Sequence, residues 1–109
     1  MDHAKTISKL PSKQIIEGFT GRFVHTDNFT IAYWDIKAGA VLPEHHHIHV
    51  QTTQVMQGAF EMTVDGETYH CEPGKIVVIP SEAVHHGKAL TDCKIMDVFS
   101  PRRDDYVIE

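Results

Sequence analysis

Short apolar runs, rich in β-branched and aromatic side chains and separated by Gly, Pro and Asp, fill the chain from about residue 18 onward. Runs of this kind are typical of β-strands. They predict strands at residues 19–25, 29–36, 47–56, 59–65, 67–72, 75–80 and 93–100. Asp65-Gly66 predicts a tight hairpin, because glycine adopts the positive φ that a type I′ turn requires. Residues 12–17 are expected to form at most a helical turn. The pattern therefore predicts an all-β fold, either a sandwich or a barrel.

Length and composition limit the classes of protein that this sequence can encode. The 109 residues, 41% hydrophobic and 23% charged, predict a single globular domain over residues 1–109. A formal charge of -5 with scattered Lys and Arg argues against binding of nucleic acid. No apolar run reaches the roughly 18 residues that span a bilayer, so we expect no membrane association and a cytoplasmic location. Cys71 and Cys93 lack a short metal-type spacing and are expected to be free thiols.

The segment PEHHHIHVQ, residues 43–51, holds four histidines. In an extended strand His45, His47, His49 and Gln51 would share one face, and His46 would lie on the other. Imidazole is a common ligand of first-row metals, and ligands two residues apart can converge on one ion. For two histidines alone, a solvated His-rich face explains the segment equally well.

The spacing around the histidines carries more information. Gly39-x5-His45-x-His47-x3-Gln51-x6-Gly58 reproduces the first motif of the cupins, G-x5-H-x-H-x3-E-x6-G, with Gln in the place of Glu.

A second cupin motif, G-x5-P-x-G-x2-H-x3-N, follows in the expected order. Gly74 opens it, and Pro80 and His85 occupy their places, whereas Glu82 replaces the glycine and Ala89 the asparagine. The chain thus resembles a small single-domain cupin, which implies a double-stranded β-helix, the jelly-roll barrel.

The resemblance also implies a metal site. Its ligands map onto His45, His47, Gln51 and His85, with His49 more remote, as part of the pocket wall. These neutral ligands leave the charge of a divalent metal uncancelled, which favours Lewis-acid chemistry; Ni, Zn, Fe, Mn and Cu all fit such a set. The alternative, a closed structural metal, is less favoured because structural zinc usually prefers several thiolates.

A narrower resemblance covers nearly the entire chain. The segments GRFVH, FTIAYWDIKAGAVLPEH and DVFSPRRDDY look like those of KdgF-type cupins, which linearise unsaturated uronates in pectin and alginate breakdown. The pattern D-x-F-x3-R of that family falls on Asp97, Phe99 and Arg103. Two residues depart from many such relatives: Ile48 replaces Pro and Val50 replaces Glu.

The resemblance implies ring opening of a 4,5-unsaturated monouronate. Asp97 would act as the base, Arg103 would bind the substrate carboxylate and Phe99 would form an apolar wall. Among earlier residues, Arg22 and Tyr33 are candidate pocket residues, with His25 and Trp34 as further possibilities.

Two other functions are open to the same scaffold. One is a non-haem metal dioxygenase of the quercetinase or cysteine-dioxygenase type; the other is a non-catalytic sugar-binding cupin. By analogy with small cupins we expect a homodimer, to which the N-terminal arm, residues 1–17, could contribute a contact.

Overall fold

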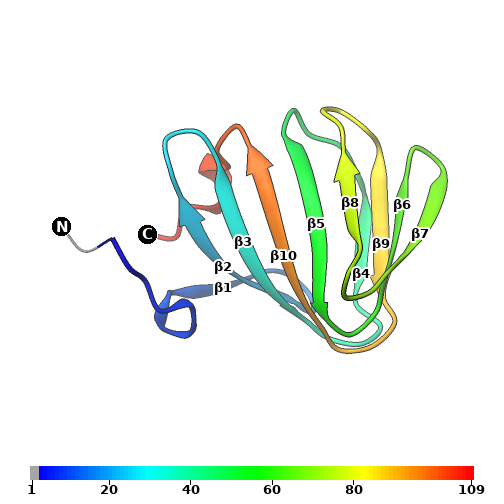
Figure 1. The fold of residues 1–109 in the computed structure, drawn as a ribbon, viewed down its shortest axis with the longest axis horizontal. Coiled ribbons are helices and arrows are strands. Elements are labelled where there is room, and N and C mark those ends of the chain that lie inside the picture. The colour runs from blue at the N-terminus through cyan, green and yellow to red at the C-terminus, as the bar shows by residue number, and fades with distance from the viewer. Residues whose placement is uncertain (1–2) are drawn as a thin grey trace.

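Ten β-strands and two short 3-10 helices, η1 (Ile7–Lys9) and η2 (Asp104–Tyr106), make up the computed structural model, which describes residues 3–109 (Figure 1). A six-stranded antiparallel sheet has the order β1 (Ser12–Ile16), β2 (Phe19–His25), β3 (Thr30–Ile36), β10 (Cys93–Ser100), β5 (Val50–Gln57), β8 (Ile76–Ile79). A four-stranded antiparallel sheet has the order β4 (Val41–His45), β9 (His85–Ala89), β6 (Phe60–Val64), β7 (Glu67–Cys71). This is the all-β, double-sheet jelly roll that the motifs implied.

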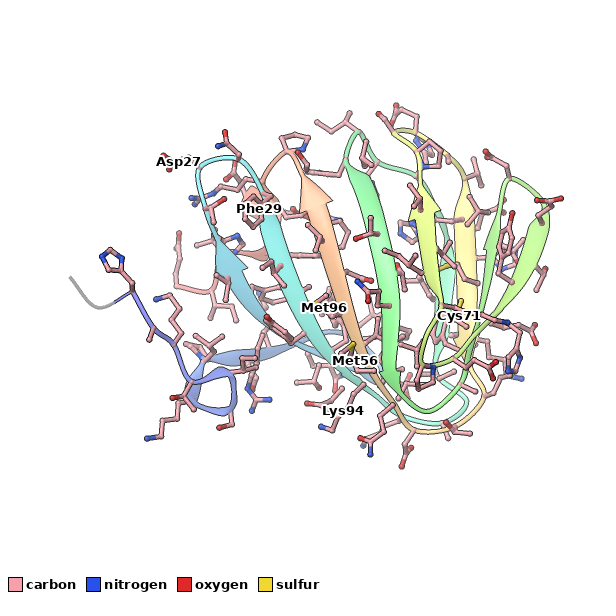
Figure 2. The ribbon with its side chains drawn as sticks, in the orientation of Figure 1. Asp27, Phe29, Met56, Cys71, Lys94 and Met96 are labelled. Atoms are coloured by element: carbon pink, nitrogen blue, oxygen red, sulfur yellow. The ribbon has the colours of Figure 1, made fainter. Side chains whose placement is uncertain are left out.

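The core lies between the two sheets, because alternate residues of each strand point inward. On β10 every second residue from Cys93 to Phe99 is buried, whereas Met96 points to the opposite face (Figure 2). The ring of Phe19 packs against both sheets. Its centroid lies 6.3 Å from that of Trp34 in the larger sheet and 6.4 Å from that of Phe60 in the smaller sheet, edge to face in both cases. The core is therefore aromatic on the side of β1 and β2.

Each of the seven predicted ranges overlaps one strand, although β5 begins at Val50 and not at residue 47, and three further strands were not predicted. Residues 12–16 form β1 rather than a helical turn, because they pair with β2. The strand β4 contains Pro43, which weakens its strand signal. In β9 the inward positions next to His85 are the small residues Gly87 and Ala89, and Gly87 is small because the ring of Phe60 lies where a side chain would be.

Residues with a positive φ lie at several turns of the chain. The hairpin between β6 and β7 turns at Asp65 (φ 47°) and Gly66 (φ 84°), as predicted. Gly58 has φ +91°, and a Cβ there would lie 2.2 Å from the main-chain oxygen of Asp92. Glu82, which stands where the second motif has glycine, also adopts a positive φ, 66°. The backbone at Glu82 thus keeps the positive φ that glycine adopts without strain, although a residue with a side chain rarely adopts it.

Cys71 and Cys93 are buried free thiols, as the sequence predicted. Within residues 3–109 no helix is long and apolar enough to cross a membrane.

Candidate metal centre and cavity

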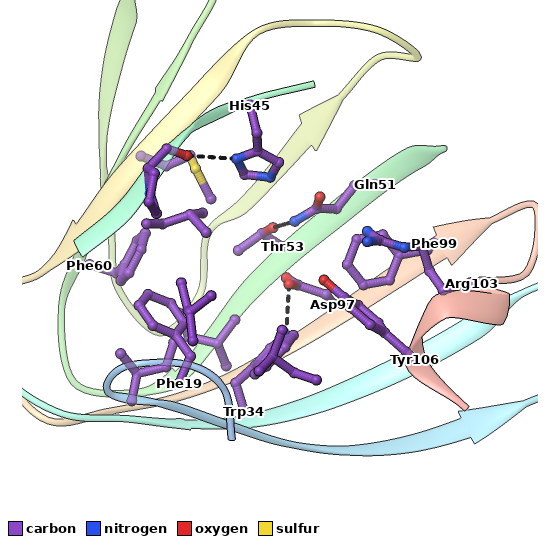
Figure 3. A pocket seen from close by; sticks show the side chains of 17 residues that line it. Phe19, Trp34, His45, Gln51, Thr53, Phe60, Asp97, Phe99, Arg103 and Tyr106 are labelled. Atoms are coloured by element: carbon purple, nitrogen blue, oxygen red, sulfur yellow. Dashed lines mark hydrogen bonds between the residues drawn. The ribbon is translucent and has the colours of Figure 1, made fainter. Parts of the chain in front are cut away.

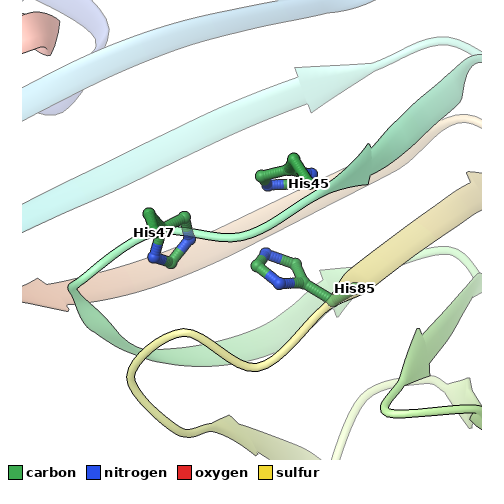
Figure 4. A group of neighbouring side chains, drawn as sticks. All are labelled: His45, His47 and His85. Atoms are coloured by element: carbon green, nitrogen blue, oxygen red, sulfur yellow. The ribbon is translucent and has the colours of Figure 1, made fainter.

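Three imidazoles meet at one end of the space between the sheets (Figure 4). His45 ends β4 and His85 begins β9, and the two residues pair directly across these strands, with ring centroids 4.1 Å apart. His47 comes from the connection that follows β4, and its ring lies 4.9 Å from that of His85. One nitrogen of each ring lies within 4.8 Å of the others. His85 has no exposed surface, and the other two are partly buried.

The three rings are held in the same way. In each, Nδ1 bonds to a main-chain carbonyl two residues away: 2.7 Å from His45 to Pro43, 3.0 Å from His47 to His49, and 2.8 Å from His85 to Ala83. A carbonyl only accepts, so Nδ1 carries the proton and Nε2 keeps a lone pair. Metal-binding histidines are usually oriented by such a bond. Burial lowers the pKa of His85 to about 4, which keeps this ring neutral and able to bind a metal.

Gln51 adds an oxygen to this nitrogen cluster. Its side chain is buried, and its amide nitrogen donates to the hydroxyl of Thr53 at 3.0 Å. The amide oxygen lies 3.1 Å from Nε2 of His47. With Nδ1 of His47 protonated, two lone-pair atoms face each other there, and a cation would stabilise this arrangement. The buried Nε2 of His85 also has no hydrogen-bond partner within the described residues. The four side chains therefore fit a divalent transition metal.

His45, His47 and Gln51 do not lie on one face of a single strand, contrary to what strand parity predicted. Residues 45–51 do not form one extended strand: β4 ends at His45 in the smaller sheet, and β5 begins at Val50 in the larger one. The intervening residues cross between the sheets, and the main-chain oxygen of His47 accepts a bond from the Glu82 amide at 2.7 Å. The crossing brings His45 and Gln51 together from opposite sheets.

The remaining histidines of the two motifs lie outside this cluster. His46 and His86 are exposed. His49 lies beside the cluster, with its ring 5.3 Å from that of His47 and 6.3 Å from that of Phe99. Burial lowers its pKa, and its buried Nδ1 has no partner among the described residues. His49 is therefore a neighbour of the three-histidine group and not a member of it.

Asp97 lies opposite Thr53 in the register of β10 and β5, on the inner face of the larger sheet. Its Oδ2 accepts a bond of 3.0 Å from the indole nitrogen of Trp34, while its buried Oδ1 has no partner within the described residues. Burial raises the pKa of the carboxyl to about 6, although contacts with Thr53, Trp34 and Gln51 favour the charged form. Asp97 thus combines a half-satisfied carboxyl with a pKa near neutrality.

Arg103 follows β10 and is held beside Phe99. Its main-chain amide donates to the buried hydroxyl of Thr30 at 2.9 Å, and its guanidinium carbon lies 4.8 Å from the ring centre of Phe99 and 4.0 Å from that of Tyr106. Cation–π contacts of this kind favour the charged form and restrict its movement. A bidentate ion pair joins Arg103 to Asp105, at 2.9 and 2.7 Å.

A cavity of about 280 Å³ connects these groups (Figure 3). Its polar lining comes from His45, Gln51, Thr53, Asp97 and Arg103. The rest is mainly apolar and is formed by Ile15, Ile16, Phe19, Trp34, Ile36, Leu42, Pro43, Phe60, Met62, Ile95, Phe99 and Tyr106. A small polar ligand could thus reach two of the proposed metal ligands, His45 and Gln51, together with the carboxyl of Asp97 and the guanidinium of Arg103.

Three residues expected in the pocket, His49, Arg22 and Tyr33, are not among those that line this cavity. Arg22 and Tyr33 do not line the cavity, because they pair with each other across β2 and β3 on the outer face of the sheet. Arg22 instead donates to the main-chain oxygen of Leu10 at 3.2 Å. Of the two further possibilities, Trp34 lines the cavity and His25 does not.

Other residues of the site were missed from the sequence. Thr53 could have been found, because it shares a strand face with Gln51. Ile15 and Ile16 could not, because their segment was not predicted to be a strand. Asp105 carries no sequence signal that separates it from the neighbouring Asp104.

The fold and the histidine cluster together define a metal-binding cupin. The sequence pattern described as "Cupin domain" matches residues 32–99, more than half of the chain. The chain therefore belongs to the cupin domain family.

Two relatives carry the name KdgF. The chain is 25% identical to the "Pectin degradation protein KdgF" of Dickeya dadantii (strain 3937) over 100 residues, which cover 89% of this chain and 91% of the relative. It is 33% identical to the solved KdgF from Halomonas sp., with a TM-score of 0.86 over 92% of this chain and 95% of the other. These matches make the chain a KdgF-like cupin. An RmlC-like cupin from Shewanella frigidimarina NCIMB 400 shares the fold, with 24% identity and a TM-score of 0.91 over 98% of this chain and 97% of that one.

Proposed function

We propose that this protein is a metal-dependent enzyme that opens 4,5-unsaturated monouronates to their keto-aldehyde form, as a step in the breakdown of pectin or alginate. The observation that carries the proposal is a cavity lined by Gln51, Asp97, Arg103 and His45, the last of which belongs to the three-histidine group. The relatives named KdgF, one of them described as a pectin degradation protein, support the choice of substrate.

The metal would be held by His45, His47, His85 and Gln51, and when bound it would supply a Lewis acid for a substrate oxygen. Gln51 links this site to the base: its amide oxygen faces His47, and its amide nitrogen bonds to Thr53, which lies opposite Asp97. These contacts fix the position of the ligands relative to the carboxyl.

Asp97 is the proposed base. It accepts the proton of the C1 hydroxyl, the C1 carbonyl forms, and the bond from C1 to the ring oxygen breaks with its electrons left on that oxygen as an enolate. Asp97 then returns the proton to C4 and the C5 ketone forms, so the reaction is an isomerisation without a co-reactant. A pKa of about 6 suits a group that must both take and give a proton near neutral pH.

Arg103 is the proposed partner of the substrate carboxylate, because a guanidinium matches a carboxylate in a two-point contact. Phe99 closes the cavity beside it; its ring lies 5.9 Å from that of His47. This apolar wall would limit the access of water to the developing enolate.

The test follows the C4=C5 ultraviolet absorbance of freshly prepared unsaturated galacturonate with metal-loaded protein, chelator-treated protein and His47→Ala. We expect accelerated decay with the loaded protein alone. Decay at the buffer rate in all three would refute the proposal.

A homodimer and a cytoplasmic location stay predictions. Ser12–Ile16 pairs on one side with β2 of its own chain and lies at the edge of the sheet. An arm contact between subunits would use its other side, and light scattering of the protein in solution measures the mass directly.

A further inference from the structure

The guanidinium of Arg103 is bound on one edge before any ligand arrives. Its Nε donates to Oδ1 of Asp105 at 2.9 Å, and its Nη2 donates to Oδ2 at 2.7 Å. These two bonds use two of the five N–H groups of the guanidinium. Three N–H groups remain, two on Nη1 and one on Nη2. That remaining pair of nitrogens forms a second edge with the fork geometry that carboxylates accept.

Burial shows on which side of Arg103 the ion pair lies. The Arg103 side chain is 11% exposed, whereas that of Asp105 is 59% exposed. Arg103 lines the cavity, and Asp105 does not. The pair therefore runs from the cavity wall outward to the surface, and Asp105 holds the edge that is turned away from the cavity.

The plane of the guanidinium is restricted as well. Its carbon lies over the rings of Phe99 and Tyr106, at 4.8 and 4.0 Å from their centres, and these two rings lie edge to face at 5.8 Å. Two neighbouring aromatic rings and a carboxylate on one edge leave the guanidinium little rotational freedom. The second edge is thereby preorganised, which reduces the cost of binding a ligand.

We propose that Asp105 is a positioning residue that turns the free edge of Arg103 toward the cavity as a binding site for a sugar carboxylate. This inference rests on the proposed function for the identity of the ligand. It predicts that loss of Asp105 weakens the binding of uronates and leaves the binding of neutral sugars unchanged.

The adjacent ion pair supplies a matched control. Arg102 Nε and Asp104 Oδ1 lie 2.8 Å apart, and the side chain of Asp104 is 85% exposed. Asp104 and Asp105 belong to the same short helix η2. Asp104→Asn thus removes the same charge, one residue away, without touching the cavity, so any difference from Asp105→Asn is not an effect of net charge.

Calorimetric titration of the metal-loaded protein with D-galacturonate and with D-galactose measures the effect, together with KM and kcat for unsaturated galacturonate. We expect Asp105→Asn to raise the Kd of galacturonate and the KM about tenfold, with a smaller change in kcat, as for a lost charged hydrogen bond. Asp105→Glu should restore both to within about threefold, and Asp104→Asn should match the wild type.

Each outcome decides between the two proposals. Turnover by the wild type with no difference between Asp105→Asn and Asp104→Asn would overturn the positioning role alone. Tighter binding of galacturonate by Asp105→Asn would also overturn the positioning role, because it is the result expected if Asp105 competes with the substrate for Arg103. Galacturonate binding that depends on Asp105 without turnover would overturn the proposed reaction alone. A wild type that binds no uronate and turns none over would overturn both.

Discussion

The buried carboxyl of Asp97 should make the stability of this protein fall as the pH rises through the mildly acidic range. The side chain is 7% exposed, and burial raises its pKa from 3.8 to about 6. Between these values the folded protein binds more protons than the unfolded chain, so the free energy of unfolding decreases with pH. A shift of about two pKa units, at about 1.4 kcal/mol each, corresponds to about 3 kcal/mol. This contribution is present below pH 4 and is lost as the pH passes 6.

Asp97→Asn removes the titration and keeps the shape of the side chain. Urea unfolding of metal-free protein between pH 4 and 7.5 gives the free energy of unfolding of wild type and variant. We expect the variant to gain about 3 kcal/mol relative to the wild type across this range, because only the wild type must bury a charge at the higher pH. Asp35→Asn, at an exposed carboxylate that pairs with Lys94, is the control and should show no comparable trend. A difference between Asp97→Asn and wild type that does not change with pH would refute the reasoning.

Three further substitutions test other parts of the structure. Gln51→Ala should lower the metal content measured by mass spectrometry, whereas Gln54→Ala on the same strand should not; equal metal content would remove Gln51 from the ligand set. Gly58→Ala should destabilise the protein by about 2 kcal/mol more than Gly74→Ala, because both have a positive φ but only Gly58 faces a carbonyl oxygen at 2.2 Å. Similar thermal unfolding of these two variants would contradict the close approach. Glu82→Gly should raise stability by about 0.5–1 kcal/mol, because glycine relieves the positive φ, and a lower melting temperature would show that the Glu82 side chain matters more.

The fold could be predicted because its strands have strong local signals and its motifs have fixed spacings. The strands that were missed carry weak signals for physical reasons. In β9 two buried positions hold the small residues Gly87 and Ala89, and at Gly87 the ring of Phe60 from the neighbouring strand fills the space of a side chain. A single strand considered by itself does not reveal the residue that packs against it.

The site could be predicted only in part. His45, His47, His85 and Gln51 come together as the motifs implied, but through a crossing between sheets that strand parity did not foresee. The pairing of Arg103 with Asp105 was also out of reach, because it depends on the path of the chain after β10. The periodicity of a single strand predicts which of its side chains share a face. Which faces of different strands then meet depends on the contacts between the strands.

The proposed reaction and the role of Asp97 are tested most directly by the decay of C4=C5 absorbance in fresh unsaturated galacturonate. Metal-loaded wild type is compared with equally loaded Asp97→Asn, each corrected for the buffer rate. We predict rapid decay with the wild type and a rate at least about a hundredfold lower with the variant, the usual scale for a lost acid–base group. Decay by the wild type at the buffer rate, or equal rates for the two proteins, would contradict this prediction.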